Sequence, residues 1–142
     1  MDTIEVQPNV EITTLQKYQK EIEKDTKLDR IILEEVQLKL PAIKAKWQSR
    51  CMNHKVDIDN LTDLYNEALV KIAQKIEAES TIALSQIMTK KQAENHPLAI
   101  KIQKQIRENT RIVEYLEKIE KTFASMSYDM KNMVELIKQE TT

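Results

Sequence analysis

Apolar side chains recur at helical spacing along most of the chain. From Trp47 to Ile72 they follow one another at alternating intervals of four and three residues, which keeps one face of a helix towards a partner helix. This first seam contains Trp47, Cys51, His54, Ile58, Leu61, Tyr65, Ala68 and Ile72. The pattern predicts a long helix that buries this face.

A second seam of the same kind occupies the C-terminal part of the chain. Its positions are Ile102, Gln105, Asn109, Ile112, Leu116, Ile119, Phe123, Met126, Met130, Met133 and Ile137. Ile106 and Val113 widen the stripe, as a helix requires when it faces more than one neighbour. The seam covers roughly 50 Å of helix at about 1.5 Å per residue. Two seams in one chain predict a long helical hairpin whose heptad-patterned helices pair within and between subunits, in a helical-bundle or ring-like homo-oligomer.

Asn109 places an amide within the second seam. A buried asparagine at such a position lowers stability and can fix the register or the oligomeric state of a helical assembly. The alternative interpretation is that Asn109 lies near a frayed or solvated end. The sequence leaves both interpretations open.

Three prolines mark the expected organisation of the chain. Pro8 indicates a short N-terminal arm, and Asn95-His96-Pro97 predicts a boundary at which Pro97 opens the last helix. At Pro41 either a new helix begins or one long helix kinks. We therefore expect a single all-helical domain over residues 1–142, with a mobile arm over 1–10, N-terminal helices over 11–94 and a C-terminal oligomerisation helix over 97–140.

A short amphipathic helix is expected before the first seam. Its apolar positions are Ile12, Leu15, Tyr18 and Ile22. Asp25 or Thr26 then has the chemistry of a residue that caps the N-terminus of a following helix. That following helix is expected to begin near Leu28 and to carry Leu28, Ile31, Ile32 and Val36.

Composition strengthens the helical prediction. The chain contains no glycine, 4% aromatic residues and 32% charged residues, and tight hairpin turns of β-sheets depend on glycine. The single cysteine excludes an intramolecular disulfide and fits a reducing cytoplasm. No apolar run approaches the roughly 18 residues of a membrane span, so we expect a soluble cytoplasmic protein.

The net charge of −1 hides an uneven distribution of charges. Residues 36–56 contain five basic and no acidic side chains, and residues 80–107 contain five basic side chains and one acidic side chain. Blocks of this kind favour either charge-matched self-association or the local binding of a polyanion.

The first basic block supplies the candidate nucleic-acid contacts. Lys44 and Lys55 fall on one flank of the first seam, and Lys46 and Arg50 fall on the other. Cations spaced along a helix can bind phosphates without sequence preference. The alternative is that these charges form interhelical pairs or solvate the helix. Trp47 and Tyr65 are able to stack on bases, but their seam positions favour a place in the core.

The sequence offers no catalytic arrangement. Cys51 and His54 share a helix face, yet no second pair with ligand spacing accompanies them, so we expect no metal and no cofactor. Phosphate-cradling loops need glycine, and a thiol nucleophile needs a shaped pocket with an oxyanion donor. We therefore expect a protein that is not an enzyme.

The order of several motifs resembles the UvsY recombination mediators of T-even-like and related phages. The resemblance covers about residues 25–75 and 100–138. It rests on Asp25-Thr26-Lys27-Leu28, on the Lys46-Trp47 step before a long charged helix, on Glu114-Tyr115-Leu116-Glu117-Lys118-Ile119, and on Tyr128-Asp129-Met130-Lys131.

The resemblance implies a function and a set of residues. It implies a homo-oligomer that binds single-stranded DNA and helps a RecA-like recombinase to displace single-strand-binding protein, without hydrolysing anything itself. The implied DNA contacts are Lys44, Lys46, Arg50 and Lys55, with Lys71 and Lys75 as the pair that the family suggests. The implied oligomerisation residues are Leu116, Ile119, Phe123, Met126, Met130, Met133 and Ile137. The alternative is a helical scaffold, adaptor or assembly chaperone that does not bind DNA.

Overall fold

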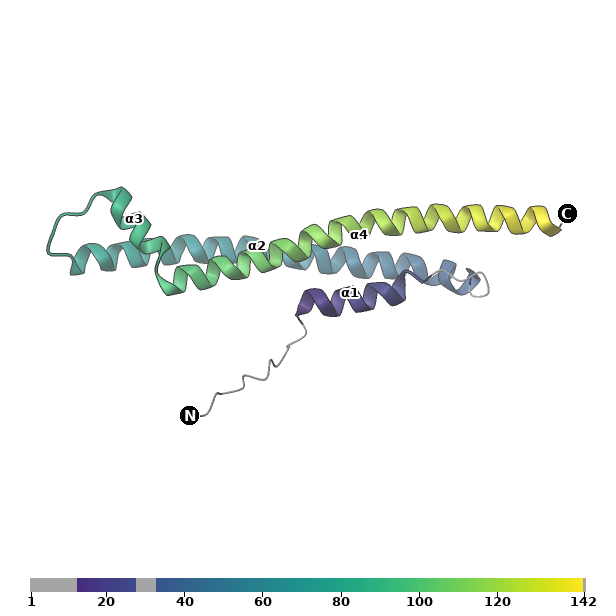
Figure 1. Cartoon of the computed structure of the whole chain (residues 1–142), viewed down its shortest axis with the longest axis horizontal. Coiled ribbons are helices and arrows are strands. Elements are labelled where there is room, and N and C mark those ends of the chain that lie inside the picture. Colours follow the sequence, from purple (N-terminus) through teal and green to yellow (C-terminus); the bar gives the residue numbers. More distant parts are fainter. Residues whose placement is uncertain (1–12, 28–32, 142) are drawn as a thin grey trace, which may run out of the picture. The chain divides into compact units, whose positions relative to one another are not determined.

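The computed structural model describes residues 13–27 and 33–141, and the described chain is all-α. It contains α1 (Thr14–Asp25), α2 (Leu33–Glu79), α3 (Gln86–Glu94) and α4 (Pro97–Thr141) (Figure 1). No strand occurs in the described ranges. The prediction of an all-helical protein is therefore confirmed.

Side chains at both ends define α1. The Thr13 hydroxyl accepts a hydrogen bond from the Gln16 amide at 3.2 Å, and the Gln16 side chain accepts one from the Thr13 amide at 3.0 Å, which is a capping box. At the other end the Thr26 amide and hydroxyl both donate to the Ile22 carbonyl. Asp25 is the last residue of α1 and Thr26 caps its C-terminus. The expected start of the next helix at Leu28, with Ile31 and Ile32, lies outside the described residues, so the prediction that Asp25 or Thr26 caps that helix remains a prediction.

A single helix, α2, passes through Pro41. Of the two possibilities at Pro41, the structure adopts the continuous helix. Proline has no amide hydrogen, so the carbonyl of Gln37 loses its usual helical partner at this point. One turn earlier, Lys39 pairs with Glu35 across four residues of the same helix.

The connection between α3 and α4 is compact. Ser85 caps the N-terminus of α3 by accepting a hydrogen bond from the Met88 amide at 3.2 Å, and Asn95 caps its C-terminus. His96 Nδ1 accepts a hydrogen bond from the Leu98 amide at 3.1 Å, and Pro97 is the first residue of α4. Because proline lacks an amide hydrogen, it is well suited to the first turn of a helix. The boundary therefore falls at Asn95-His96-Pro97, where the sequence predicts it.

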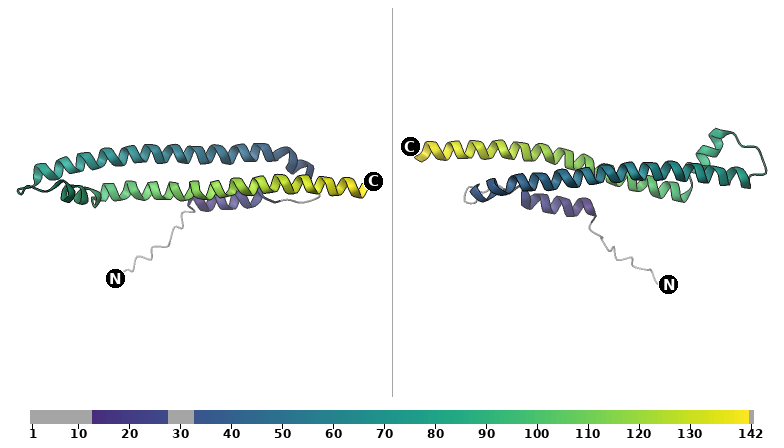
Figure 2. Two further views of the ribbon diagram at one scale, coloured as in Figure 1. Left: turned by 90° about the horizontal axis from the view of Figure 1, so that it is seen from above. Right: turned by 180° about the vertical axis from the view of Figure 1, so that it is seen from behind.

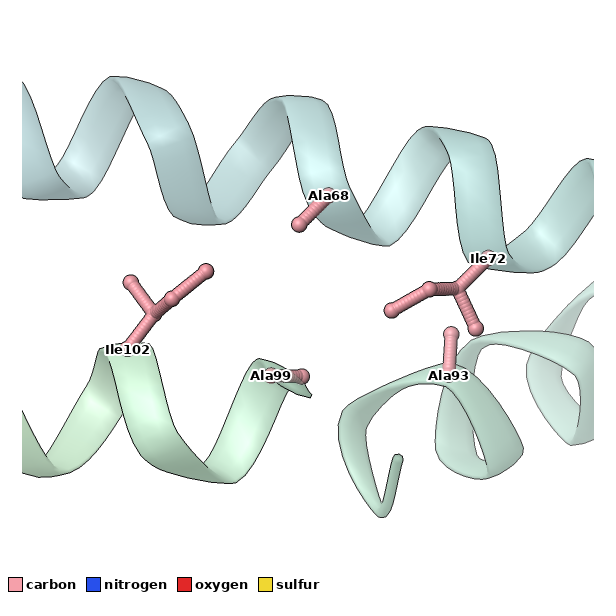
Figure 3. Close-up of a cluster of buried hydrophobic side chains, with 5 residues drawn as sticks. All are labelled: Ala68, Ile72, Ala93, Ala99 and Ile102. Atoms are coloured by element: carbon pink, nitrogen blue, oxygen red, sulfur yellow. The ribbon is translucent and has the colours of Figure 1, made fainter. Parts of the chain in front are cut away.

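The chain divides into two compact units. Unit 2, residues 46–120, contains the second part of α2, all of α3 and the first part of α4. Both views in Figure 2 show α2 and α4 running side by side in this unit. At one end the packing is built from small and β-branched side chains, namely Ala68, Ile72, Ala93, Ala99 and Ile102 (Figure 3). Tyr65 packs against this cluster.

Unit 1 contains α1, the start of α2 as far as Ala45, and α4 from Lys121 onwards, within the described residues. Its buried apolar side chains are Ile22, Leu40, Phe123, Met126 and Met130. A groove of about 390 Å³ lies between α2 and α4 in this unit, and its floor includes Leu40, Met130 and Val134.

Candidate nucleic-acid interface

Trp47 lies within the first basic block, between Lys46 and Arg50 in the sequence. Its side chain is 1% exposed, so the indole is buried, as is the Cys51 side chain one turn further along α2. The indole therefore offers no open face on which a base can stack. Of the two interpretations of Trp47, the structure adopts the core residue.

Two cations lie against this buried ring. The Nζ atom of Lys46 is 5.0 Å from the centroid of the Trp47 ring, and the Cζ atom of Arg50 is 4.7 Å from it. At these separations the negative face of an aromatic ring attracts a positive charge. Lys46 and Arg50 are both partly exposed. The indole thus restrains two cationic groups at the surface of α2.

Lys55 forms an interhelical ion pair. Its Nζ atom is 3.1 Å from a carboxylate oxygen of Glu117 in α4, and both side chains are about half exposed. The hydrogen bond with Glu117 is the main cause that raises the pKa of Lys55 above that of an ordinary lysine. For Lys55, the structure thus agrees with the alternative interpretation of the basic block, in which a charge on the flank pairs with the neighbouring helix.

The remaining candidate cations lie in different surroundings. Lys44 belongs to unit 1 and lines its groove together with Lys131. Lys71 belongs to unit 2 and lines a hollow between α2 and α4 together with Lys101. Lys75 is exposed on α2, one turn beyond Lys71. The six candidate DNA contacts therefore fall on both units, with Lys44 in unit 1 and the other five in unit 2.

Cys51 is buried and His54 is partly buried on the same helix, α2. Burial is the main cause that raises the pKa of the Cys51 thiol, so the protonated form is favoured and the nucleophilic thiolate is not. His54 Nδ1 lies 2.8 Å from Oδ1 of Asn109 in α4. Among the described residues, no group of three or more His, Cys, Asp or Glu side chains is placed to hold a metal ion.

Comparison of the chain with known protein families, curated proteins and solved structures found no match. Within the part of the chain that the structure describes, no helix is both long enough and apolar enough to span a membrane.

The His54–Asn109 contact distinguishes between the two interpretations of Asn109, a polar residue on the seam or a residue near a frayed or solvated end. The amide lies on the seam and contacts the opposite helix, and its Nδ2 donates to the Gln105 carbonyl at 2.9 Å. Asn109 is partly buried and lies well inside α4, so it is not at a frayed end. A polar pair at one level of an apolar seam favours the alignment in which the two groups meet.

Several of the expected oligomerisation residues are buried inside the single chain. Leu116, Phe123, Met126 and Met130 are each at most 5% exposed. Ile119, Met133 and Ile137 are only partly buried. The first four side chains therefore contribute to packing within the subunit, and only the last three retain accessible surface.

The sequence patterns did not lead to a prediction for the exposed apolar side chains that lie beside the two seams. Leu64 and Leu98 are 49% and 48% exposed and line the same hollow in unit 2. The signal was available, because Asp57, Leu64 and Lys71 are spaced seven residues apart and so share one edge of α2. Lys101 and Glu108 have the same spacing in α4.

Proposed function

We propose that this protein is a non-enzymatic single-stranded-DNA-binding protein that acts as a recombination mediator. In this role it helps a RecA-like recombinase to replace single-strand-binding protein on the DNA. The observation that supports DNA binding is the surface around Trp47, where the buried ring holds Lys46 and Arg50 within a stretch that has no acidic residue. The recombination role rests on the resemblance to the UvsY family.

Phosphate contacts of this type give affinity without sequence preference. Trp47 is buried, so the proposed contact is electrostatic and involves no base stacking at this position. A single chain presents only a few cations on this surface. We propose that a homo-oligomer repeats the surface and so raises the affinity for a long strand by multivalency. Ile119, Met133 and Ile137 are the seam residues with accessible surface for contacts between subunits.

The first test is the fluorescence anisotropy of a labelled oligothymidine titrated with the protein across a range of salt concentrations. We expect the affinity to fall as the salt concentration rises. We also expect duplex DNA to be a poor competitor for the labelled single strand. Each lost phosphate contact should reduce the slope of log K against log salt by about 0.7 for a single strand. Replacing Lys46→Gln and Arg50→Gln together should therefore weaken binding and reduce the slope by about 1.4.

A matched control separates a local contact from a general loss of charge. Lys90→Gln with Lys91→Gln also removes two positive charges, from exposed positions on α3. We expect this control to keep most of the affinity. Equal losses in the two double variants would contradict a specific role for the Trp47 surface, and absence of binding at low salt would contradict the whole proposal.

A scaffold or adaptor that does not bind DNA is the second candidate. Two observations favour it, since Lys39 pairs with Glu35 and Lys55 pairs with Glu117. At least two cations of the first basic block, Lys39 and Lys55, thus have carboxylate partners within the chain. This candidate predicts assembly of the protein without any affinity for the oligothymidine.

A further inference from the structure

An open groove runs along one side of the hairpin in unit 2. It consists of two hollows between α2 and α4, of about 350 and 390 Å³, which share Leu64 and Gln105 as lining residues. We call this surface the Leu64 groove. Its remaining lining residues are Asp57, Asn60, Leu61, Glu67, Ala68, Lys71, Ile72, Leu98, Lys101, Ile102 and Asn109.

The floor of the Leu64 groove is apolar and accessible. Leu64 and Leu98 are each about half exposed, on opposite walls. Three members of the buried cluster, namely Ala68, Ile72 and Ile102, line the groove (Figure 3). Leucine side chains in such a position gain free energy when a further helix covers them.

The charges along the groove indicate what covers it. On α2, Asp57 and Lys71 lie seven residues to either side of Leu64, about 10 Å away in each direction. Asp57 and Lys71 both line the groove, as does Glu67, which lies three residues beyond Leu64. On α4, Lys101 lines the groove four residues before Gln105. On α2, an acid and a base are therefore placed symmetrically about Leu64 within the groove.

This arrangement is self-complementary under one kind of rotation. A two-fold axis perpendicular to the helices, at the level of Leu64 and Gln105, places each helix antiparallel to its own copy. It brings Asp57 to Lys71 of a second copy. An interface between identical subunits has this property when residue i meets residue j and j meets i.

The alternative two-fold arrangement has unfavourable electrostatics. An axis parallel to the helices keeps the same ends of the two grooves together. Lys71 and Lys101 line the same hollow as Glu67, so four lysines and two glutamates from two copies would then meet, with an excess of positive charge. Like charges close together lower the stability of an interface, whereas the antiparallel arrangement places Asp57 against Lys71.

We propose that the Leu64 groove is a homodimer interface in which two copies of this chain pack antiparallel about a two-fold axis at Leu64. Leu64 meets Leu64 of the second copy, and the pairs between Asp57 and Lys71 fix the register. This interface is separate from Lys46 and Arg50 and does not depend on DNA binding. It also assigns Lys71 to a protein contact rather than to a phosphate.

The test is the molar mass of the full chain by light scattering and by sedimentation equilibrium over a range of concentrations, without DNA. We expect Leu64→Glu to reduce the mass of the assembled particle by a factor of two. Val70→Glu is the matched control, since Val70 is 57% exposed on α2 but does not line this groove. Circular dichroism checks that both variants remain helical.

Charge reversal gives a second test that does not disturb the core. Asp57→Lys alone and Lys71→Glu alone should each weaken the dimer, and the two together should restore it. Asp57 and Lys71 are about 21 Å apart along α2 and cannot pair within one chain, so restoration reports a contact between copies. The proposal would be overturned if the Leu64→Glu variant had the wild-type mass. It would also be overturned if the double charge-reversal variant dimerised no more tightly than the two single variants. The Lys46→Gln, Arg50→Gln variant should keep the wild-type mass, which separates this proposal from DNA binding.

Discussion

The two ends of the helix pair in unit 2 use the same residue spacing but side chains of very different size. At one end Trp47 and Leu116 are buried to 1% exposure. At the other end the buried positions include Ala68 and Ala99. At this second end two hollows lie beside the seam.

The two ends therefore present different surfaces beside the seam. At the first end Lys46 and Arg50 lie against the buried indole ring. At the second end Leu64 and Leu98 are each about half exposed. One end thus presents fixed charges, and the other presents an apolar groove.

The largest expected effect is at the Trp47 end. Trp47→Ala should lower the free energy of unfolding by about 3–5 kcal/mol, because it removes a fully buried indole and leaves a cavity. Urea denaturation followed by circular dichroism measures this change. Met52→Ala is the control, since Met52 lies on the same part of α2 at 58% exposure and should change stability by less than about 0.5 kcal/mol. Similar losses in both variants would contradict the role of Trp47 as the core of this end.

The Ala99 end should respond to added volume. Ala99 has no exposed surface, so Ala99→Leu should force the helices apart and lower the free energy of unfolding by about 1–3 kcal/mol. Ala78→Leu provides the control, because Ala78 is exposed on α2. If Ala99→Leu stabilised the protein instead, the hollows would have to extend beneath Ala99, and the seam there would not be close-packed.

Much of the fold follows from periodicity and from proline and capping chemistry. The spacing of apolar residues from Trp47 onwards predicts a helix that the structure contains within α2, and Pro97 marks the start of α4. Pro41 could not be assigned from sequence, because the penalty of a proline inside a helix competes with packing on both sides of it. The role of Thr26 at the end of α1 does not follow from the sequence, because a threonine hydroxyl can cap either end of a helix and its neighbours in sequence do not determine which.

The candidate site was less predictable than the fold. Periodicity identifies which face of α2 is buried, and so indicates that Trp47 lies in the core. It does not say which carboxylate Lys55 meets, because Glu117 is 62 residues away in sequence and the alignment of the two helices decides the contact. Leu116 and Phe123 were assigned to contacts between subunits for a similar reason. A seam pattern does not distinguish packing within a chain from packing between chains.

The polar pair between the two ends offers a smaller effect. Asn109→Ala removes the partner of His54 Nδ1 and should lower the free energy of unfolding by about 1 kcal/mol. In a double-mutant cycle, His54→Ala should cost less in the Asn109→Ala background than in the wild type. Asn53→Ala, at an exposed neighbouring position, should have no measurable effect. Strict additivity of the two changes would show that the contact contributes nothing.

The smallest effect concerns the exposed pair at the Trp47 end. Glu117 raises the pKa of Lys55 above the ordinary lysine value of 10.5. Glu117→Gln should return this pKa towards 10.5, which an NMR titration of the Lys55 side chain measures, and Glu114→Gln on the same helix should leave it unchanged.

The same shift determines when the Lys55–Glu117 pair contributes to stability. A lysine whose pKa is raised by folding stabilises the folded state below its unfolded pKa, and this contribution disappears as the pH rises through the folded value. The urea midpoint of the wild type should therefore slightly exceed that of Glu117→Gln at pH 8, and the difference should vanish once the pH is well above 10.5. Because both side chains are about half exposed, added salt should reduce the difference at pH 8 as well. A difference that persists at high pH would mean that Glu117 stabilises the hairpin through contacts other than the charge of Lys55.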